Sequence, residues 1–205
     1  MNNTLILFTK SPVICRVKTR LWPTLSHREC LYLHKKLIHN IISEQRHHSD
    51  INIKIYSTEI KHKFFNNKQT YKQVGKDLGM RMNNAIMHEL KYTEKVLLIG
   101  SDCVEFTQDY IKHAFEVLKN KNDIVIAPSN DGGYALIGMR KPHPTLFNNI
   151  PWSTTKVLSR TLDIIQKENK KLTLLPEVTD IDEYSDLVRL HQSNLLPSWA
   201  SSVIK

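Results

Sequence analysis

The sequence has few cysteines, and their spacing fits neither a disulfide framework nor a zinc site. Cys15, Cys30 and Cys103 are odd in number, and none of them belongs to a C-x-x-C pair. Disulfide-stapled secreted domains and zinc ribbons depend on paired cysteines, so both classes are disfavoured. Free thiols are typical of a reducing compartment, and we expect the protein to be cytoplasmic.

Long apolar runs are also missing. No run approaches the roughly 20 residues of a membrane-spanning helix. The opening segment MNNTLILFTK lacks the basic region and the apolar length of a signal peptide. Neither the Walker A pattern G-x-x-x-x-G-K nor the dinucleotide-binding pattern G-x-G-x-x-G occurs. We therefore expect no membrane span, no signal peptide and no phosphate loop of these two kinds.

What the chain does contain is a core-forming composition and an excess of positive charge. It has 205 residues, of which 40% are hydrophobic, and its formal charge is +9 at pH 7. That length predicts a single domain over residues 1–205. The positive charge favours anionic partners, which are phosphorylated small molecules, nucleic acid or an anionic membrane surface.

Apolar runs typical of buried strands alternate with amphipathic segments typical of helices. Strands are expected in the segments TLILF, INIKIYS, KVLLIG, DIVIAP, YALIGM and KLTLLP. Helices are expected at about 26–42, 78–90, 107–118, 154–167 and from 183 onward. This alternation predicts an α/β fold with a mostly parallel central sheet and helices on both faces. In such sheets ligands bind beyond the carboxyl ends of the strands.

A basic loop, KSPVICRVKTRLWP, follows the first predicted strand. Its cations and its hydroxyl donor are Lys10, Arg16, Lys18, Thr19 and Arg20. Arginine can hold a phosphate through two parallel hydrogen bonds, and lysine supplies a compact charge. A basic run alone more often forms a solvated surface. Its place at a strand end favours a phosphate site here.

Three aspartates follow other strands. Asp102 comes directly after KVLLIG, whereas Asp180 and Asp182 follow KLTLLP. Hard cations such as Mg²⁺ and Mn²⁺ prefer such carboxylate oxygens and would bridge them to phosphate. Aspartates also occupy turns and the N-termini of helices for local reasons. On residue chemistry alone, both interpretations stay open.

Two further segments combine glycine with polar residues. In SNDGGYALIG, Gly132 and Gly133 would allow a ligand to approach the backbone, and Asp131 would bind a hydroxyl or a base. The D-G pair between two strand-like runs equally predicts a β-hairpin. In QVGKDLGMRM, the polar residues from Gln73 to Arg81 lie where the chain enters a helix. A simple loop with an N-terminal cap is the alternative there.

Taken together, the motifs resemble a known bacterial family. They are LILFTKSP…RVKTRL, GKDLGMRM, LLIGSDC, DGGYALIGM, PWST and DIDEYSDL, and they extend over residues 5–190. They resemble glycosyltransferase-like proteins of the nucleotide-diphospho-sugar transferase superfamily, some of them labelled arsenosugar-biosynthesis glycosyltransferases. A more distant resemblance is to molybdenum-cofactor and phospholactate nucleotidyltransferases. The resemblance implies a GT-A-type fold with a nucleotide bound over the strand ends.

The resemblance also implies a role for each matching residue. Nucleotide binding would involve Lys10, Arg16, Lys18, Thr19, Arg20, Gly75, Asp77, Arg81 and Ser101. The sugar or acceptor would lie against Gly132, Gly133, Tyr134, Trp152 and Ser153. Mg²⁺ or Mn²⁺ would be held by Asp102, together with Asp180 or Asp182. Asp131 would also face the sugar or acceptor, and in a glycosyl transfer it would be the catalytic base, with Lys18 and Arg20 stabilising the departing diphosphate.

The chain departs from the family pattern at two places. The family usually carries Pro-Gly where this chain has Ile14-Cys15, and Pro-Gly-Leu where it has Val104-Glu105-Phe106. The first departure removes a glycine from the phosphate loop, where it would allow a close backbone approach to phosphate.

Three functions are compatible with these residues. The favoured one is a metal-dependent glycosyltransferase that uses a nucleoside diphosphate sugar. A nucleotidyltransferase would join a nucleoside triphosphate to a phosphorylated small molecule and release pyrophosphate, and it would need no dedicated base. A non-catalytic nucleotide- or RNA-binding protein is the third, although the basic residues are not interleaved with aromatics as single-strand binding requires. We expect no DNA partner.

Overall fold

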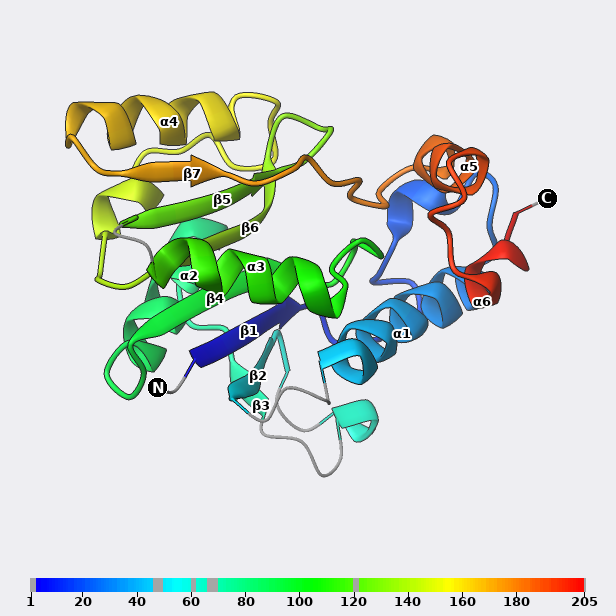
Figure 1. Ribbon diagram of the computed structural model, residues 1–205. Coiled ribbons are helices and arrows are strands. Elements are labelled where there is room, and N and C mark those ends of the chain that lie inside the picture. The colour runs from blue at the N-terminus through cyan, green and yellow to red at the C-terminus, as the bar shows by residue number, and fades with distance from the viewer. Residues whose placement is uncertain (1–2, 46–49, 60–61, 66–69, 120–121, 205) are drawn as a thin grey trace.

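The computed structural model describes residues 3–45, 50–59, 62–65, 70–119 and 122–204 (Figure 1). Within these ranges one seven-stranded sheet has the order β3-β2-β1-β4-β6-β5-β7. Its strands are β1 (Asn3–Thr9), β2 (Ile51–Ser57), β3 (Thr70–Lys72), β4 (Lys95–Gly100), β5 (Ile124–Pro128), β6 (Tyr134–Met139) and β7 (Leu172–Leu174). β6 runs antiparallel to β4 and β5, and the other neighbouring pairs are parallel.

Helices cover both faces of the sheet, which confirms the predicted α/β fold. They are α1 (His27–Glu44), α2 (Leu78–Glu89), α3 (Gln108–Lys119), α4 (Val157–Lys167), α5 (Tyr184–Gln192) and α6 (Ser198–Ser201). α1 and α3 pack on one face, and α2 and α4 pack on the other. α5 and α6 pack against the outer side of α1, at the right of Figure 1. No helix of the described segments is long and apolar enough to cross a membrane.

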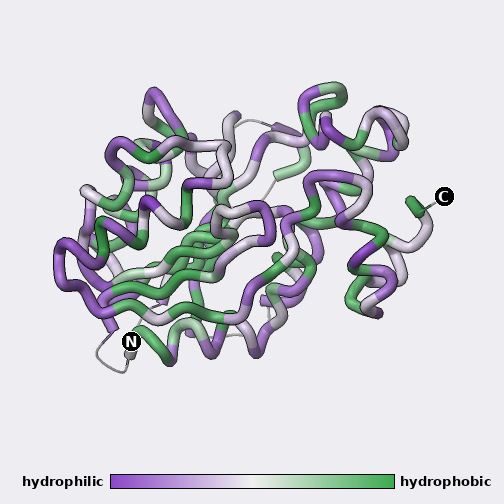
Figure 2. The backbone as a smooth tube through the Cα atoms, turned by 90° about the horizontal axis from the view of Figure 1, so that it is seen from above, coloured by the Kyte–Doolittle hydropathy of each residue, from purple (hydrophilic) through white to green (hydrophobic). Residues whose placement is uncertain are grey.

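The strands form because their apolar side chains are buried on both faces of the sheet. In β1, Leu5 and Leu7 pack into the cluster beneath α1 and α3, whereas Ile6 packs into the cluster beneath α2 and α4. All three side chains are fully buried. Figure 2 shows this as a group of hydrophobic strands enclosed by more hydrophilic chain. Continuous apolar runs, rather than alternating ones, are what a sheet covered on both faces requires.

Local signals in the sequence place several helix ends correctly. Ser26 and Glu29 form the predicted capping box at the start of α1, with reciprocal side-chain-to-backbone hydrogen bonds. The Thr107 hydroxyl accepts a hydrogen bond from the Tyr110 amide and caps α3, as predicted. α4 begins at Val157, three residues later than the Thr154 expected from its apolar stripe.

The DGG segment forms the turn of a β-hairpin between β5 and β6, as the D-G alternative predicts. Gly132 has φ +84°, a left-handed conformation that glycine adopts without strain. A Cβ atom at this position would lie 2.4 Å from the Thr155 carbonyl oxygen. The turn therefore requires glycine for packing against the segment that leads into α4.

The parallel arrangement of β1 and β4 sets the position of the cleft. The two strands are in register, with Phe8 opposite Gly100, so their carboxyl ends lie side by side. The Thr9 hydroxyl donates to the Ser101 hydroxyl oxygen at 2.9 Å and ties the two exits together. As a result, the basic loop after β1 and Asp102 after β4 emerge at the same edge of the sheet.

Candidate active site

A cleft of about 450 Å³ opens at the carboxyl ends of β1, β2 and β4. The basic loop and the short 3₁₀ helix Thr19–Leu21 form one side, and the first turns of α2 and the start of β6 form another. Of the site residues predicted from the sequence, the cleft is lined by Lys10, Lys18, Thr19, Arg20, Arg81, Ser101, Asp102, Tyr134, Ser153, Asp180 and Asp182.

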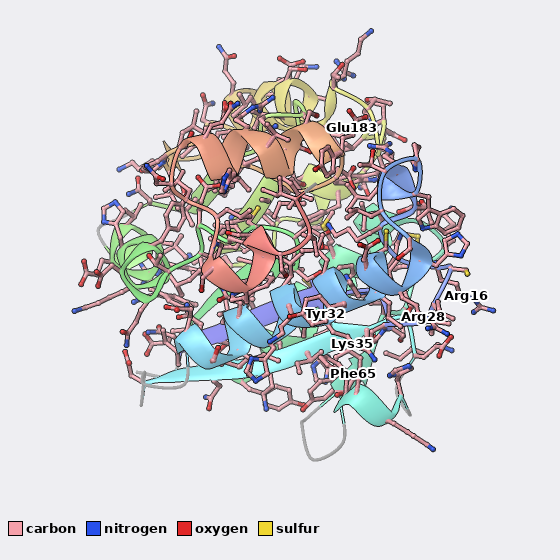
Figure 3. The ribbon with its side chains drawn as sticks, turned by 90° about the vertical axis from the view of Figure 1, so that its right-hand side faces the viewer. Arg16, Arg28, Tyr32, Lys35, Phe65 and Glu183 are labelled. Atoms are coloured by element: carbon pink, nitrogen blue, oxygen red, sulfur yellow. The ribbon has the colours of Figure 1, made fainter. Side chains whose placement is uncertain are left out.

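Several other predicted site residues have structural partners outside the lining of this cleft. Arg16 is largely exposed and pairs with Glu59 at 3.6 Å. Figure 3 shows Arg16 at the outer edge of the molecule. The Asp77 carboxylate caps α2 by accepting a hydrogen bond from the Met80 amide at 2.8 Å. Asp77 therefore forms the N-terminal helix cap that the sequence offered as the alternative to nucleotide binding.

Lys18 and Asp102 form a close ion pair on the floor of the cleft. The Lys18 Nζ lies 2.8 Å from the Asp102 Oδ1, and the Lys18 side chain is only 2% exposed. The Lys18 ammonium also donates to the Ile181 carbonyl oxygen. Burial alone would lower the pKa of Lys18, but the negative charges of Asp102 and Asp180 outweigh it and raise that pKa. The predicted phosphate-binding lysine and the predicted metal-binding aspartate thus hold each other in the free protein.

Arg20 and Asp182 form a second ion pair nearer the surface. The Arg20 Nη1 donates to the Asp182 Oδ2 at 2.7 Å, and the two side chains are 59% and 39% exposed. Such exposed pairs contribute only about 0–1 kcal/mol to stability. Both side chains line the cleft, so the Arg20 guanidinium keeps donors available to an anionic ligand.

Asp180 is a buried carboxyl group next to Asp102. Burial and the neighbouring charge of Asp102 raise its pKa to about 7. The Cys103 thiol faces its Oδ1 at 3.9 Å. Burial, with the charge of Asp180, raises the pKa of that thiol well above its usual value, so Cys103 stays a donor. A carboxylate that is costly to ionise inside a cleft is typical of functional sites.

Replacing Asp180 by Asn is expected to stabilise the protein at alkaline pH. Between the ordinary pKa of 3.8 and the folded value of about 7, the folded protein keeps a proton that the unfolded chain has released. Wild-type stability therefore falls as pH rises through this window, and Asn removes that cost. We expect a gain of about 1–2 kcal/mol at pH 8 and little change at pH 4. Urea unfolding at the two pH values measures it, and a gain that does not depend on pH would contradict the assignment.

Asp186 positions the loop that carries Asp180 and Asp182, and the sequence interpretation did not include it. Its Oδ2 accepts hydrogen bonds from the amides of Asp182 and Glu183 at 3.0 and 2.8 Å. Its Oδ1 accepts from the Asn130 side chain at 3.2 Å. Asp186 lies three residues after the N-cap Glu183, a spacing that is itself a capping-box signal.

His34 of α1 is a second residue that sequence reasoning did not single out. Its Nε2 donates to the Lys10 carbonyl oxygen at 3.0 Å, and its Nδ1 faces the Asp102 carboxylate at 3.9 Å. Burial lowers its pKa below the usual value. The signal was present in the sequence, because His34 lies three and four residues before Leu37 and Ile38 and so falls within the apolar stripe of α1.

Asp131 is held by the hairpin turn. Its Oδ1 accepts hydrogen bonds from the Ser129 hydroxyl at 2.5 Å and from the Gly133 amide at 2.9 Å. Asp131 is absent from the lining of the cleft, as are its neighbours Gly132 and Gly133. Through these contacts Asp131 stabilises the hairpin turn. Its role as a base stays a prediction.

An aromatic wall lies opposite the basic loop. Tyr134 lines the cleft, and Trp152 packs against it edge to face with ring centroids 6.4 Å apart. Trp152 in turn covers Gly79 in the first turn of α2, where an added Cβ would lie 2.6 Å from the indole nitrogen. Packing thus fixes the predicted sugar-side aromatics, with Tyr134 facing the cleft and Trp152 behind it.

At both departures from the family pattern, the residues present make contacts of their own. Cys15 adopts φ +64°, a conformation that glycine tolerates better, and its thiol lies 3.2 Å from the His27 Nδ1. The Glu105 carboxylate accepts a hydrogen bond from the Thr179 amide at 2.6 Å and anchors the segment next to Asp180.

The carboxylates suit a divalent cation that shares its coordination with a substrate. In the described part of the chain, no three His, Cys, Asp or Glu side chains gather into a ready-made metal site. Mg²⁺, however, is commonly bound by one or two carboxylates together with substrate phosphates and water. The negative charge of Asp102 contributes to the raised pKa of Asp180 because the two carboxylates repel each other when both are ionised. A cation between them would relieve that repulsion.

Comparison with solved structures defines the fold class. A proposed nucleotide-diphospho-sugar transferase from Desulfovibrio desulfuricans G20 superposes with a TM-score of 0.90 at 24% identity, covering 100% of this chain and 94% of that one. A CMP:2-keto-3-deoxy-manno-octonic acid synthetase complexed with CTP matches with a TM-score of 0.60 at 7% identity, covering 96% and 100%. The chain has the α/β fold of nucleotide-diphospho-sugar transferases and nucleotidyltransferases.

Sequence comparison gives the family. The chain belongs to the family described as "Uncharacterized protein conserved in bacteria (DUF2064)", which matches residues 45–154. It is also 29% identical over 134 residues to a 2-phospho-L-lactate guanylyltransferase of Methanosphaera stadtmanae. That match covers 62% of this chain and spans 57% of the relative. These findings agree with the resemblance recognised in the motifs.

Proposed function

We propose that the protein is a nucleotidyltransferase, which joins a nucleoside triphosphate to a phosphorylated small molecule and releases pyrophosphate. The observation that carries this choice is the position of Asp131. Its Oδ1 accepts hydrogen bonds from Ser129 and Gly133, and Asp131 is not among the residues that line the cleft. Nucleotidyl transfer to an already ionised phosphate needs positioning and charge stabilisation but no base.

Residues of the cleft would meet those two requirements. An acceptor phosphate oxygen would attack the α-phosphorus, and the bond to the bridging oxygen would break with its electron pair leaving on pyrophosphate. Lys18 and Arg20 both line the cleft and would stabilise the negative charge that develops on the departing pyrophosphate. When bound, Mg²⁺ or Mn²⁺ at Asp102 and Asp180 would neutralise phosphate charge. The name of one relative, a guanylyltransferase, and that of one structural neighbour, a CTP-bound synthetase, support a nucleoside triphosphate as substrate.

Glycosyl transfer from a nucleoside diphosphate sugar is the second candidate. The observation in its favour is the nearly full-length similarity to the Desulfovibrio protein, which is described as a nucleotide-diphospho-sugar transferase. This reaction would need a base beside the acceptor hydroxyl, and Asp131 would have to provide it while its Oδ1 accepts hydrogen bonds from Ser129 and Gly133.

Asp131→Asn separates the two reactions. With a nucleoside triphosphate, a phosphorylated hydroxy acid and Mg²⁺, we expect pyrophosphate release from the wild type and retention of most of that rate in the variant. Loss of a general base would instead lower the rate by about 10²–10⁴. A coupled pyrophosphate assay with GTP and CTP measures the first reaction, and hydrolysis of nucleotide sugars is measured in parallel. Transfer from a nucleotide sugar without any pyrophosphate signal would overturn the proposal.

A further inference from the structure

We propose that Lys18 and a divalent cation compete for Asp102. In the free protein the Lys18 ammonium occupies the carboxylate, and it yields the carboxylate to the cation when it moves to the phosphates of a bound nucleotide. The move of Lys18 to the nucleotide phosphates, which is the second half of this proposal, rests on the proposed function. The competition for Asp102, which is the first half, does not. The consequence is that nucleotide and metal bind together, each weakly without the other.

The contacts of Asp102 carry the first half. Its Oδ1 lies 2.8 Å from the Lys18 Nζ and also accepts a hydrogen bond from the Ser101 hydroxyl at 3.1 Å. The Asp102 side chain is 30% exposed, so a cation can still approach the carboxylate from the cleft. It would then lie a few ångströms from a full positive charge that is itself almost completely buried. Repulsion between cations is weakly screened in such surroundings.

Neighbouring groups hold Lys18 on Asp102 before a substrate arrives. The Ile181 carbonyl holds Lys18 in place from the other side. His34 also faces Asp102 and adds no negative charge. Without nucleotide, a divalent ion that reached Asp102 would therefore have to displace a buried ammonium that both this carboxylate and the Ile181 carbonyl hold.

The place of Lys18 in the basic loop and its flexible side chain allow the ammonium to exchange Asp102 for a phosphate. Lys18 has φ 51° and ψ 41°, a left-handed conformation at the start of the 3₁₀ helix, next to Thr19 and Arg20 in the basic loop. Its four-carbon side chain carries a compact charge that can change partners by rotation. A triphosphate beside Arg20 would present several charged oxygens to the ammonium, and a cation on Asp102 would bridge to the same phosphates. The exchange thus leaves every charge paired.

Binding of Mn²⁺ alone tests the competition without any substrate. Electron paramagnetic resonance measures free Mn²⁺ in titrations of the wild type and of Lys18→Gln, each without nucleotide. Because coupling free energies commonly correspond to factors of 5–150, we expect Lys18→Gln to bind Mn²⁺ at least ~10-fold more tightly than the wild type. The gain should disappear in Lys18→Gln/Asp102→Asn. Lys112→Gln on the exposed side of α3 makes the same change in net charge and should behave as the wild type does.

The outcomes decide the two halves separately. Equal Mn²⁺ affinity in the wild type and Lys18→Gln, or an equal gain in Lys112→Gln, would overturn the competition. Should Lys18→Gln not fold by circular dichroism, Lys18→Met serves the same test, because it also removes the ammonium. In the wild type, Mn²⁺ and GTP or CTP should tighten each other's binding by the same factor. If no nucleotide binds, the proposed function and the second half fail, and the Mn²⁺ titration still decides the first.

Discussion

Asp102→Asn is expected to lower turnover by a factor of about 10²–10³, because it removes the carboxylate beside which phosphate charge would be neutralised. It also leaves the buried Lys18 ammonium without its main partner. Breaking a buried ion pair from one side costs about 3 kcal/mol or more when the other charge stays buried. We therefore expect loss of both turnover and stability, measured by pyrophosphate release and by urea unfolding.

A double variant separates the two effects of that substitution. Lys18→Met/Asp102→Asn removes both charges, and replacing a buried pair by uncharged groups is often nearly neutral for stability. We expect stability to return to within about 1 kcal/mol of the wild type while turnover stays lost. If turnover returned together with stability, Asp102 would be a structural partner of Lys18 and not part of the active site.

Arg20→Ala is expected to weaken nucleotide binding by about tenfold or more, because one charge-assisted contact contributes about 1.5–3 kcal/mol. The melting temperature without ligand should barely move, since the pair with Asp182 is mostly exposed. Isothermal titration with the preferred nucleoside triphosphate and Mg²⁺ measures the affinity.

Arg16→Ala is the matched control for Arg20→Ala. Arg16 lies in the same basic loop and carries the same charge, but it pairs with Glu59 and does not line the cleft. We expect its affinity for nucleotide to stay within about twofold of the wild type, as for other exposed charges. Equal losses in both variants would mean that the loop acts through its overall charge, and the assigned contact of Arg20 would be wrong.

Much of the fold could be predicted from local patterns. Continuous apolar runs such as KVLLIG identified strands buried on both faces, and β4 occupies residues 95–100 as expected. The Ser26 capping box and the Thr107 cap located the starts of α1 and α3 because these are interactions between residues three apart. The D-G pair correctly indicated the β5–β6 hairpin, since its turn chemistry is also local.

The site was predictable as a set of residues but not as a set of pairs. Most of the cations and carboxylates chosen from the motifs do line one cleft. Yet Lys18 meets Asp102, and Arg20 meets Asp182, across 84 and 162 positions of sequence. Such pairing depends on β1 lying beside β4 and on the return of the chain after β7. Those features are set by tertiary packing, and no local pattern encodes them.

A crystal structure grown with Mg²⁺ and the nucleoside triphosphate of highest affinity decides whether this cleft is the active site. We expect the triphosphate in the cleft at the carboxyl ends of β1 and β4, with Arg20 and Lys18 contacting its phosphates. We also expect the cation between those phosphates and Asp102, and the Lys18 ammonium moved away from that carboxylate. A triphosphate bound elsewhere, or a cleft that stays empty at saturating nucleotide, would mean that the cleft is not the nucleotide site.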